Sequence, residues 1–342
     1  TTDESDIRPA ALRDLGAVGM ELTVDGFASF RLPLLGQHTV LNALAALGMP
    51  SIGVITNAAV AHLENFGTVR EVARAKSELA EELGKDDWLI IHRDSEELYR
   101  ENRARRCGII TFGTSDESDI RPAALRDLGA DGMELTVDGF ASFRLPLLGK
   151  HNVLNALAAL GASRALGVPS ELAVGALATV RPGKGRMELK TVGPATFIDD
   201  SYNANPVSTE AALETLFSLS GFERRAAVLG GMLELGETAE EWHERLGAQA
   251  GRADMVFLVG RHAEAVRRGA VGTQGRHTVL VCDSHADAAQ RIMAVWQKGD
   301  IFLVKGSRGA EMEKVLEELE KRAGAAGPNN RNATSANAKR GL

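Results

Sequence analysis

The rest of this 342-residue chain is arranged around IDDSYNANP, residues 198–206. Ile198 closes an apolar run that is typical of a strand, and Pro206 can open a helix, because proline is tolerated at the first helical position. Short polar side chains fill the loop between them, at the kind of strand end beyond which ligands bind in open α/β sheets. The alternative interpretation is an Asx-rich turn that only caps the next helix, and the residue types by themselves leave it open.

Strands and helices alternate on both sides of this passage, which predicts an α/β fold. After it, amphipathic helices separate four apolar runs and predict a small parallel sheet with right-handed crossovers, at 226–231, 255–260, 278–284 and 301–307, with a last helix at 311–322. Before it, we predict strands at 51–56, 88–91, 107–113, 187–192 and 195–199, and helices at 68–83, 95–106, 151–166 and 170–179. The tail, residues 323–342, has little apolar content and is expected to be disordered.

The composition argues against several classes of protein. Hydrophobic residues make up 44% and charged residues 25%, as in soluble globular proteins, and the length allows two or three domains. A net charge of −7 argues against a nucleic-acid partner. No apolar run approaches the ~18 residues of a membrane-spanning helix and no signal peptide is visible, so we expect a cytoplasmic protein without membrane insertion. The chain opens on Thr1 rather than Met, which fits a fragment, and Cys107 and Cys282 are expected to be buried free thiols.

A near-identical repeat occupies the beginning of the chain. Residues 1–48 match residues 114–161 with a constant shift of 113 positions, and a recent duplication, an engineered join and an assembly fault are all compatible with it. The pairs that differ are Thr2/Ser115, Val18/Asp131, Gln37/Lys150 and Thr39/Asn152. Each copy contains MELTVDGFASFRLPLLG, whose Asp-Gly predicts a hairpin. One fold has a single place for this unit, so the first copy has to pack elsewhere, stay loose or swap between chains; we expect a monomer or a domain-swapped dimer.

Five ordered motifs carry a family resemblance over about residues 50–320: GKHNVLNALAA, RPGKGRMEL, IDDSYNANP, LGGMLELG and LVKGSRG. In this order they resemble the Mur ligases, and in particular the branch that joins D-alanyl-D-alanine to a UDP-N-acetylmuramoyl tripeptide. The resemblance implies an incomplete central ATPase-type domain, a mixed sheet with helices, over residues 49–204. It implies a Rossmann-like C-terminal domain with a parallel sheet over residues 205–322.

A magnesium site is implied near residues 61–79. From spacing alone, Lys76 is a helix lysine of the kind that usually stays solvated. In Mur ligases the matching lysine is carbamylated and the residue that matches His62 helps to bind Mg²⁺. A carbamate supplies the hard oxygen ligands that Mg²⁺ prefers, and its formation requires a neutral amine, which local desolvation favours. Glu78 is the alternative ligand nearby.

An ATP site is implied by residues that match the family's nucleotide contacts: His151, Asn155, Arg186, Asp200, Tyr202 and Asn203. An Asn amide both donates and accepts, which suits the adenine edge, and a guanidinium makes forked bonds to phosphate oxygens. The carboxylate of Asp200 matches the group that holds the ribose. Capping and packing remain the alternative for His151 and Asn155, and a basic surface turn for Arg186.

The implied substrate site lies at strand-to-helix turns of the C-terminal domain, where backbone amides attract anions. It comprises Asn205, Glu234, Lys305, Ser307 and Arg308. Gly231 stands where the family often has Asp, so part of this contact differs from the family pattern.

The phosphate loop of the family is not found in this sequence. None of the Gly-Lys pairs at 84–85, 149–150 and 183–184 is followed by Ser or Thr, as a P-loop requires. In the family, this loop and the domain that grips the UDP-sugar lie upstream of the matched part. Because a cradle of amides, Lys and Mg²⁺ carries much of phosphoryl-transfer catalysis, we expect a weak or inactive enzyme as the chain stands.

The resemblance implies an ATP-dependent amide ligase of peptidoglycan precursor synthesis, with ATP and Mg²⁺ as cofactors. Its substrates would be a UDP-N-acetylmuramoyl peptide, activated as an acyl phosphate, and D-alanyl-D-alanine, whose amine attacks it. Two alternatives stay open. One is a non-catalytic remnant that binds nucleotide or dipeptide, and the other is a ligase of the folate-polyglutamate type.

Overall fold

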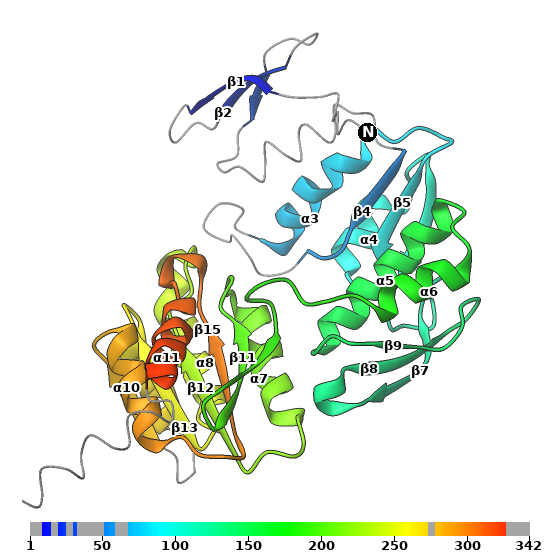
Figure 1. Ribbon diagram of the computed structural model, residues 1–342. Helices are drawn as coiled ribbons and strands as arrows, with labels where there is room; N and C mark the ends of the chain where they lie inside the picture. The colour runs from blue at the N-terminus through cyan, green and yellow to red at the C-terminus, as the bar shows by residue number, and fades with distance from the viewer. Residues whose placement is uncertain are drawn as a thin grey trace, which may run out of the picture. The chain divides into compact units, whose positions relative to one another are not determined.

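The computed structural model describes residues 9–14, 20–24, 30–32, 51–58, 68–272 and 278–325 (Figure 1). These residues divide between two compact units. Unit 1 takes the described residues of 1–58, 70–121 and 157–170, and unit 2 takes those of 59–69, 122–156 and 171–342. No helix within the described ranges has the length and apolar character needed to cross a membrane.

Unit 2 is built on a six-stranded sheet in the order β10-β11-β15-β12-β13-β14. The strands are β10 (Glu188–Val192), β11 (Ala195–Asp200), β12 (Arg224–Leu229), β13 (Met255–Val259), β14 (Thr278–Cys282) and β15 (Asp300–Lys305). β10 pairs with β11 in antiparallel fashion and all other neighbours are parallel. The four predicted C-terminal strands and their parallel pairing are therefore confirmed, and β10 adds an antiparallel edge.

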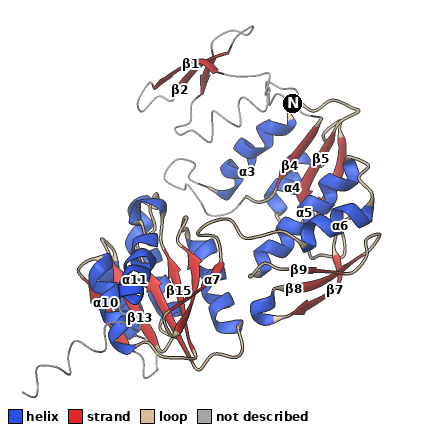
Figure 2. Cartoon of the chain, viewed as in Figure 1, coloured by secondary structure: helices blue, strands red, loops and turns tan. Residues whose placement is uncertain are grey.

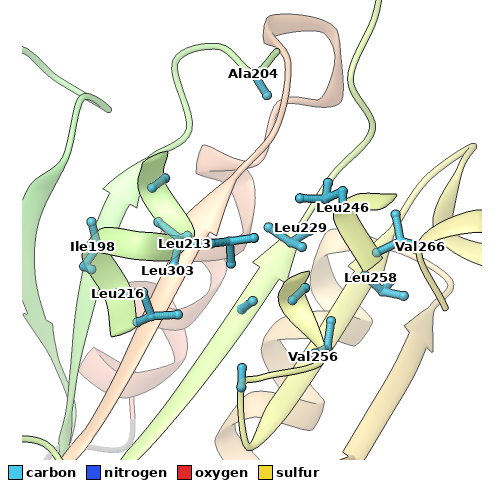
Figure 3. Packing of buried hydrophobic residues seen from close by; sticks show 14 of the residues in the cluster. Ile198, Ala204, Leu213, Leu216, Leu229, Leu246, Val256, Leu258, Val266 and Leu303 are labelled. Atoms are coloured by element: carbon cyan, nitrogen blue, oxygen red, sulfur yellow. The ribbon is translucent and has the colours of Figure 1, made fainter. Parts of the chain in front are cut away.

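Helices cover both faces of this sheet (Figure 2). They are α7 (Pro206–Ser218), α8 (Ala239–Ala250), α9 (Ala263–Val271), α10 (His285–Val295) and α11 (Glu313–Ala325). Side chains alternate along each strand, so Leu229, Leu258 and Leu303 pack with α7, α8 and α9 on one face (Figure 3). Val228 and Phe302 pack with α10 and α11 on the other. The strands are buried on both faces, which explains why their sequences are continuous apolar runs.

The C-terminal sheet starts earlier in the chain than the domain boundary predicted at residues 204 and 205. β10 and β11 precede that boundary, yet β11 pairs with β15 through the register Thr196↔Ile301 to Asp200↔Lys305. The passage 198–206 is thus a strand, a loop and a helix start within one unit. At the other end, α11 runs three residues into the predicted tail, and residues 326–342 lie outside the described residues.

Unit 1 contains a parallel sheet of β4 (Ile52–Ile55), β5 (Trp88–His92) and β6 (Gly108–Phe112), in that order. Its helices include α3 (Val69–Ser77), the short η2 (Glu78–Ala80) and α4 (Glu96–Asn102). Leu89, Ile90 and Ile91 of β5 have no solvent exposure, so both faces of this strand are covered. Two further helices have the positions that the sequence predicts: α5 (Lys150–Ala165), which unit 2 and unit 1 share, and α6 (Ser170–Ala178), which belongs to unit 2 from residue 171 on.

Both copies of the repeat form the same three-stranded antiparallel sheet. The first copy gives β1 (Pro9–Asp14), β2 (Met20–Val24) and β3 (Phe30–Leu32), and the second gives β7 (Pro122–Asp127), β8 (Met133–Val137) and β9 (Phe143–Leu145). The register is identical, including an irregularity after the first pair of each sheet. The predicted hairpin is confirmed in each copy, and an additional strand precedes it. Most of residues 1–48 lie outside the described residues, so their packing stays a prediction.

Candidate functional site

A buried ion pair lies at the carboxyl ends of two central strands of unit 2. Asp200 ends β11 and Lys305 ends β15, and the parallel register places the two residues side by side. Lys305 Nζ donates to Asp200 Oδ2 at 2.6 Å and to the Asn203 carbonyl at 3.0 Å. The Lys305 side chain is 2% exposed, and burial lowers the pKa of its ammonium while Asp200 opposes that shift. The sequence predicted both residues, but for different ligands, and the structure brings them together.

The neighbouring carboxylate, Asp199, is occupied by structural contacts. Its oxygens accept from Lys190 Nζ at 2.7 Å and from Ser201 Oγ at 2.6 Å. These contacts tie β10 to β11 and fix the start of the loop. Of the two adjacent aspartates, Asp200 is therefore the one whose carboxylate remains directed at the strand end.

Arg186 lies beside this ion pair. Its guanidinium stacks on the Tyr202 ring, 4.0 Å from the centroid, an arrangement in which the ring face attracts the cation. The backbone holds the two segments together, because Tyr202 N donates to the Gly185 carbonyl at 3.0 Å and Met187 N donates to Asp200 Oδ1 at 3.2 Å. Gly185 has φ +67°, where a side chain would be strained. Arg186 itself is solvent-exposed, so it is free to meet a ligand.

His151 faces the same ion pair from the first turn of α5. Burial lowers the pKa of its ring, Asp200 raises it and Lys305 lowers it. The ring is therefore neutral near pH 7. Gly149 has φ +86°, and a Cβ at that position would lie 2.7 Å from the His151 ring, so the turn requires glycine. Asn155 donates from Nδ2 to Asn152 Oδ1 at 3.1 Å and is a solvent-exposed residue.

The two asparagines of the central passage have local roles. Asn205 is the N-cap of α7: its side chain accepts from Ser208 N, and Ser208 Oγ accepts from Asn205 N. Asn203 Oδ1 accepts from Ala204 N at 2.9 Å. Asn205 therefore caps α7, as both interpretations of this passage allow, and a ligand contact by either residue stays a prediction.

The remaining predicted substrate residues lie on two strand-end turns. Ser307 N donates to the Gly231 carbonyl at 3.0 Å, which joins the turn after β15 to the turn after β12. The Ser307 hydroxyl is buried and finds no hydrogen-bond partner among the described residues. Arg308 pairs with Glu313 at 2.7 Å. Glu234 adopts φ +62°, which bends the turn after β12.

Lys76 lies in α3 of unit 1. Its Nζ donates to the Asn57 carbonyl at 2.7 Å. Burial lowers the pKa of Lys76, which increases the fraction of the neutral amine that carbamate formation requires. His62 lies outside the described residues. Within the described part of the chain, no group of three or more His, Cys, Asp and Glu side chains could hold a metal ion. Lys76 as a carbamate fits one ligand of Mg²⁺, and the described residues supply no complete set.

Sequence reasoning missed two contacts that shape the site. It did not single out the Lys190–Asp199 pair or the buried His243, which binds the turn after β12. A histidine in an otherwise charged helix carries no motif, and only its burial distinguishes it. Both cysteines are buried free thiols, as predicted.

Comparison with known proteins gives two family matches on this chain. Residues 47–163 match the Mur ligase middle domain, and residues 185–308 match the Mur ligase glutamate ligase domain. Among curated relatives, the UDP-N-acetylmuramoyl-tripeptide–D-alanyl-D-alanine ligase of Bacillus subtilis is 33% identical over 285 residues, which cover 82% of this chain and 61% of that protein. The Escherichia coli ligase of the same name is 31% identical, and the match covers 80% of this chain and 61% of that protein.

Solved structures agree with these matches. MurF from Acinetobacter baumannii superposes with a TM-score of 0.72 at 28% identity, covering 82% of this chain and 62% of that chain. MurF ligase from Thermotoga maritima in complex with ADP superposes with a TM-score of 0.72 at 25% identity, covering 84% of this chain and 65% of that chain. The chain thus spans about three fifths of the length of its relatives. It belongs to the Mur ligase family, of which it carries the middle and the C-terminal domain.

Proposed function

We propose that this chain contributes the nucleotide-binding and amine-binding parts of an ATP-dependent ligase that adds D-alanyl-D-alanine to a UDP-N-acetylmuramoyl tripeptide. The observation that carries the proposal is the group of Asp200, Lys305, Arg186 and His151 at the carboxyl ends of β11 and β15. Strand ends of this kind are where open α/β sheets bind ligands. The same proposal includes a cytoplasmic location and small-molecule substrates, because ATP and the sugar-linked precursor are small, charged molecules.

Asp200 keeps the capacity to hold a ribose. A carboxylate offers about four lone-pair sites. Lys305 uses one site on Oδ2 and Met187 N uses one on Oδ1, so about two remain for hydroxyl donors. The hydrogen bond from Lys305 also fixes the carboxylate in place. In this proposal Arg186 meets the phosphates, while His151 and Asn155 lie at the adenine.

The reaction needs an anion site and a place for the incoming amine. The substrate carboxylate attacks the γ-phosphate of ATP, releasing ADP and leaving an acyl phosphate. The amine then attacks the acyl carbon and phosphate departs. In this proposal Ser307, Arg308 and Glu234 bind the dipeptide, and Asn203 and Tyr202 line the nucleotide. Mg²⁺, held by His62 and the carbamate of Lys76, would neutralise phosphate charge.

Calorimetric titration with ATP and with D-alanyl-D-alanine tests the binding step. Arg186→Ala is expected to weaken ATP binding roughly 10- to 150-fold, since a charge-assisted hydrogen bond contributes about 1.5–3 kcal/mol. Lys184→Ala removes an exposed cation of the same loop and serves as the matched control, with affinity expected to stay near that of the unmodified chain. Absence of heat from both ligands would contradict the proposal.

Phosphate release separates catalysis from binding. The assay contains ATP, the tripeptide precursor and the dipeptide, and each is omitted in turn. Release that requires all three supports ligation, whereas binding without release supports the non-catalytic remnant. Replacing the two substrates by a folate and L-glutamate tests the folate-type alternative, for which the chain offers a fold likeness to Mycobacterium tuberculosis folylpolyglutamate synthase at 18% identity.

A further inference from the structure

His243 is a buried histidine of α8 that lies outside the ion-pair group. It has no solvent exposure. Its Nε2 lies 2.8 Å from the backbone N of Met232, and its Nδ1 lies 2.6 Å from the Ala239 carbonyl. A backbone N–H can only donate and a carbonyl can only accept, so the ring proton lies on Nδ1 and Nε2 is the acceptor. These two contacts define one neutral tautomer.

The peptide unit that His243 binds is held at both ends. Met232 N–H and the Gly231 carbonyl belong to the same planar peptide group. The N–H donates to His243, and the carbonyl accepts from Ser307 N at 3.0 Å. One hydrogen bond thus comes from α8 and the other from the turn after β15. Rotation of this peptide would break both.

The two strand-end turns lie unusually close together at this point. A Cβ at Gly306 would lie 3.3 Å from the Cα of Gly230 in the other turn and 2.5 Å from Met312 Cγ, and a Cβ at Gly230 would lie 2.7 Å from Met312 Sδ. Gly230 N donates to the Lys305 carbonyl at 2.8 Å. The two glycines therefore permit the turn after β12 to approach the turn after β15. The peptide between residues 231 and 232 fixes how the two turns are oriented.

We propose that His243 is a positioning residue, whose neutral ring holds the 231–232 peptide in the orientation that places Ser307 and the end of β15 for the amine substrate. That the substrate is the amine of the ligase reaction rests on the proposed function. That His243 fixes the orientation of the 231–232 peptide does not depend on it. His243 touches no reacting atom; it acts through Gly231 and Ser307.

Protonation would remove this acceptor, since an imidazolium donates from both nitrogens. The groups that face the ring are His262, stacked on it at 4.2 Å between centroids, and Glu240, which lies 3.8 Å from His262 and is paired with Arg268. Burial lowers the pKa of His243, the Ala239 carbonyl raises it, His262 lowers it and Glu240 raises it. The ring therefore stays neutral near pH 7, as the hydrogen bond from Met232 requires.

Two amide substitutions separate the two contacts of the ring. In His243→Gln the side-chain oxygen reaches as far as Nε2 and can accept from Met232 N. In His243→Asn the shorter amide replaces Nδ1 and leaves Met232 N without an acceptor. Both variants lose the ring and its stacking on His262, so a purely structural role predicts similar behaviour for the two.

Hydrogen exchange at the Met232 amide reads the peptide without any ligand. We expect exchange about tenfold faster or more in His243→Asn and close to the unmodified rate in His243→Gln, since a lost buried hydrogen bond changes local opening by about that factor. The affinity for D-alanyl-D-alanine, measured by calorimetric titration, is expected to fall about tenfold in the Asn variant alone. The affinity for ATP is expected to stay unchanged in both variants. Equal exchange rates in the two variants would overturn the proposal. If exchange at the Met232 amide follows these expectations but the unmodified chain does not bind D-alanyl-D-alanine, the hold of His243 on the peptide stands and the proposed function is overturned.

Discussion

Replacing Asp200 with Asn removes the counter-charge of a buried ammonium with little change of shape. Nζ of Lys305 lies 2.6 Å from Asp200 Oδ2, and the two side chains are 2% and 14% exposed. At an effective dielectric constant of about 20, charges at this separation attract by about 6 kcal/mol. Desolvation of both charges offsets much of that in the intact pair. Removing one partner leaves the other desolvated, and we expect a loss of about 3–5 kcal/mol in the free energy of unfolding.

Urea and thermal denaturation measure this loss at pH 7. For a unit of this size the midpoint temperature should fall by roughly 6–20 °C. Glu214→Gln is the matched control, because it removes a carboxylate from the exposed pair with Arg252 and should cost less than about 1 kcal/mol. The double variant Asp200→Leu with Lys305→Met removes both charges and should lie within about 1 kcal/mol of the unmodified chain.

The loss in Asp200→Asn should also depend on pH. Burial lowers the pKa of Lys305 in the folded state and Asp200 opposes that shift, so Asp200→Asn lowers this pKa further, whereas the unfolded lysine keeps the ordinary value of 10.5. Between those two pKa values the unfolded chain binds more protons, so stability rises with pH. The penalty should therefore be largest at neutral pH and shrink as the pH approaches 10. A loss below about 1 kcal/mol at pH 7, or a double variant as unstable as the sum of its single changes, would refute the reasoning.

Three further outcomes follow from single contacts. Asn205→Ala removes the N-cap of α7 and should lower the free energy of unfolding by about 1 kcal/mol, measured by urea denaturation. Gly132→Ala should cost several kcal/mol, because its Cβ would lie 2.1 Å from the Leu145 carbonyl, whereas Gly167→Ala, with nothing within 4 Å, should cost about 1 kcal/mol; equal losses would contradict this. Burial raises the pKa of the Cys282 thiol to about 11, so thiol reagents at pH 8 should label it only after unfolding, and rapid labelling of the folded chain would show a different environment.

The strands and helices of unit 2 were largely predictable, because a sheet buried on both faces leaves continuous apolar runs in the sequence. β7 was not predictable in the same way. Its residues are mostly exposed and begin with Pro122, so neither burial nor alternation marks it as a strand. The β10–β11 pair was predicted as two strands, but its sheet was not, since the sequence does not state which strand β11 joins.

The candidate site shows the same limit more sharply. A family pattern named Asp200 and Lys305 separately, and 105 positions separate them in the chain. Their pairing follows from one structural fact, the register Asp200↔Lys305 between parallel strands, which places the two last residues of β11 and β15 side by side. His243 has no pattern at all, because its role depends on which peptide its ring meets after folding. Residue types therefore indicate which groups can bind a charged ligand, while the register and the turns decide which of them act together.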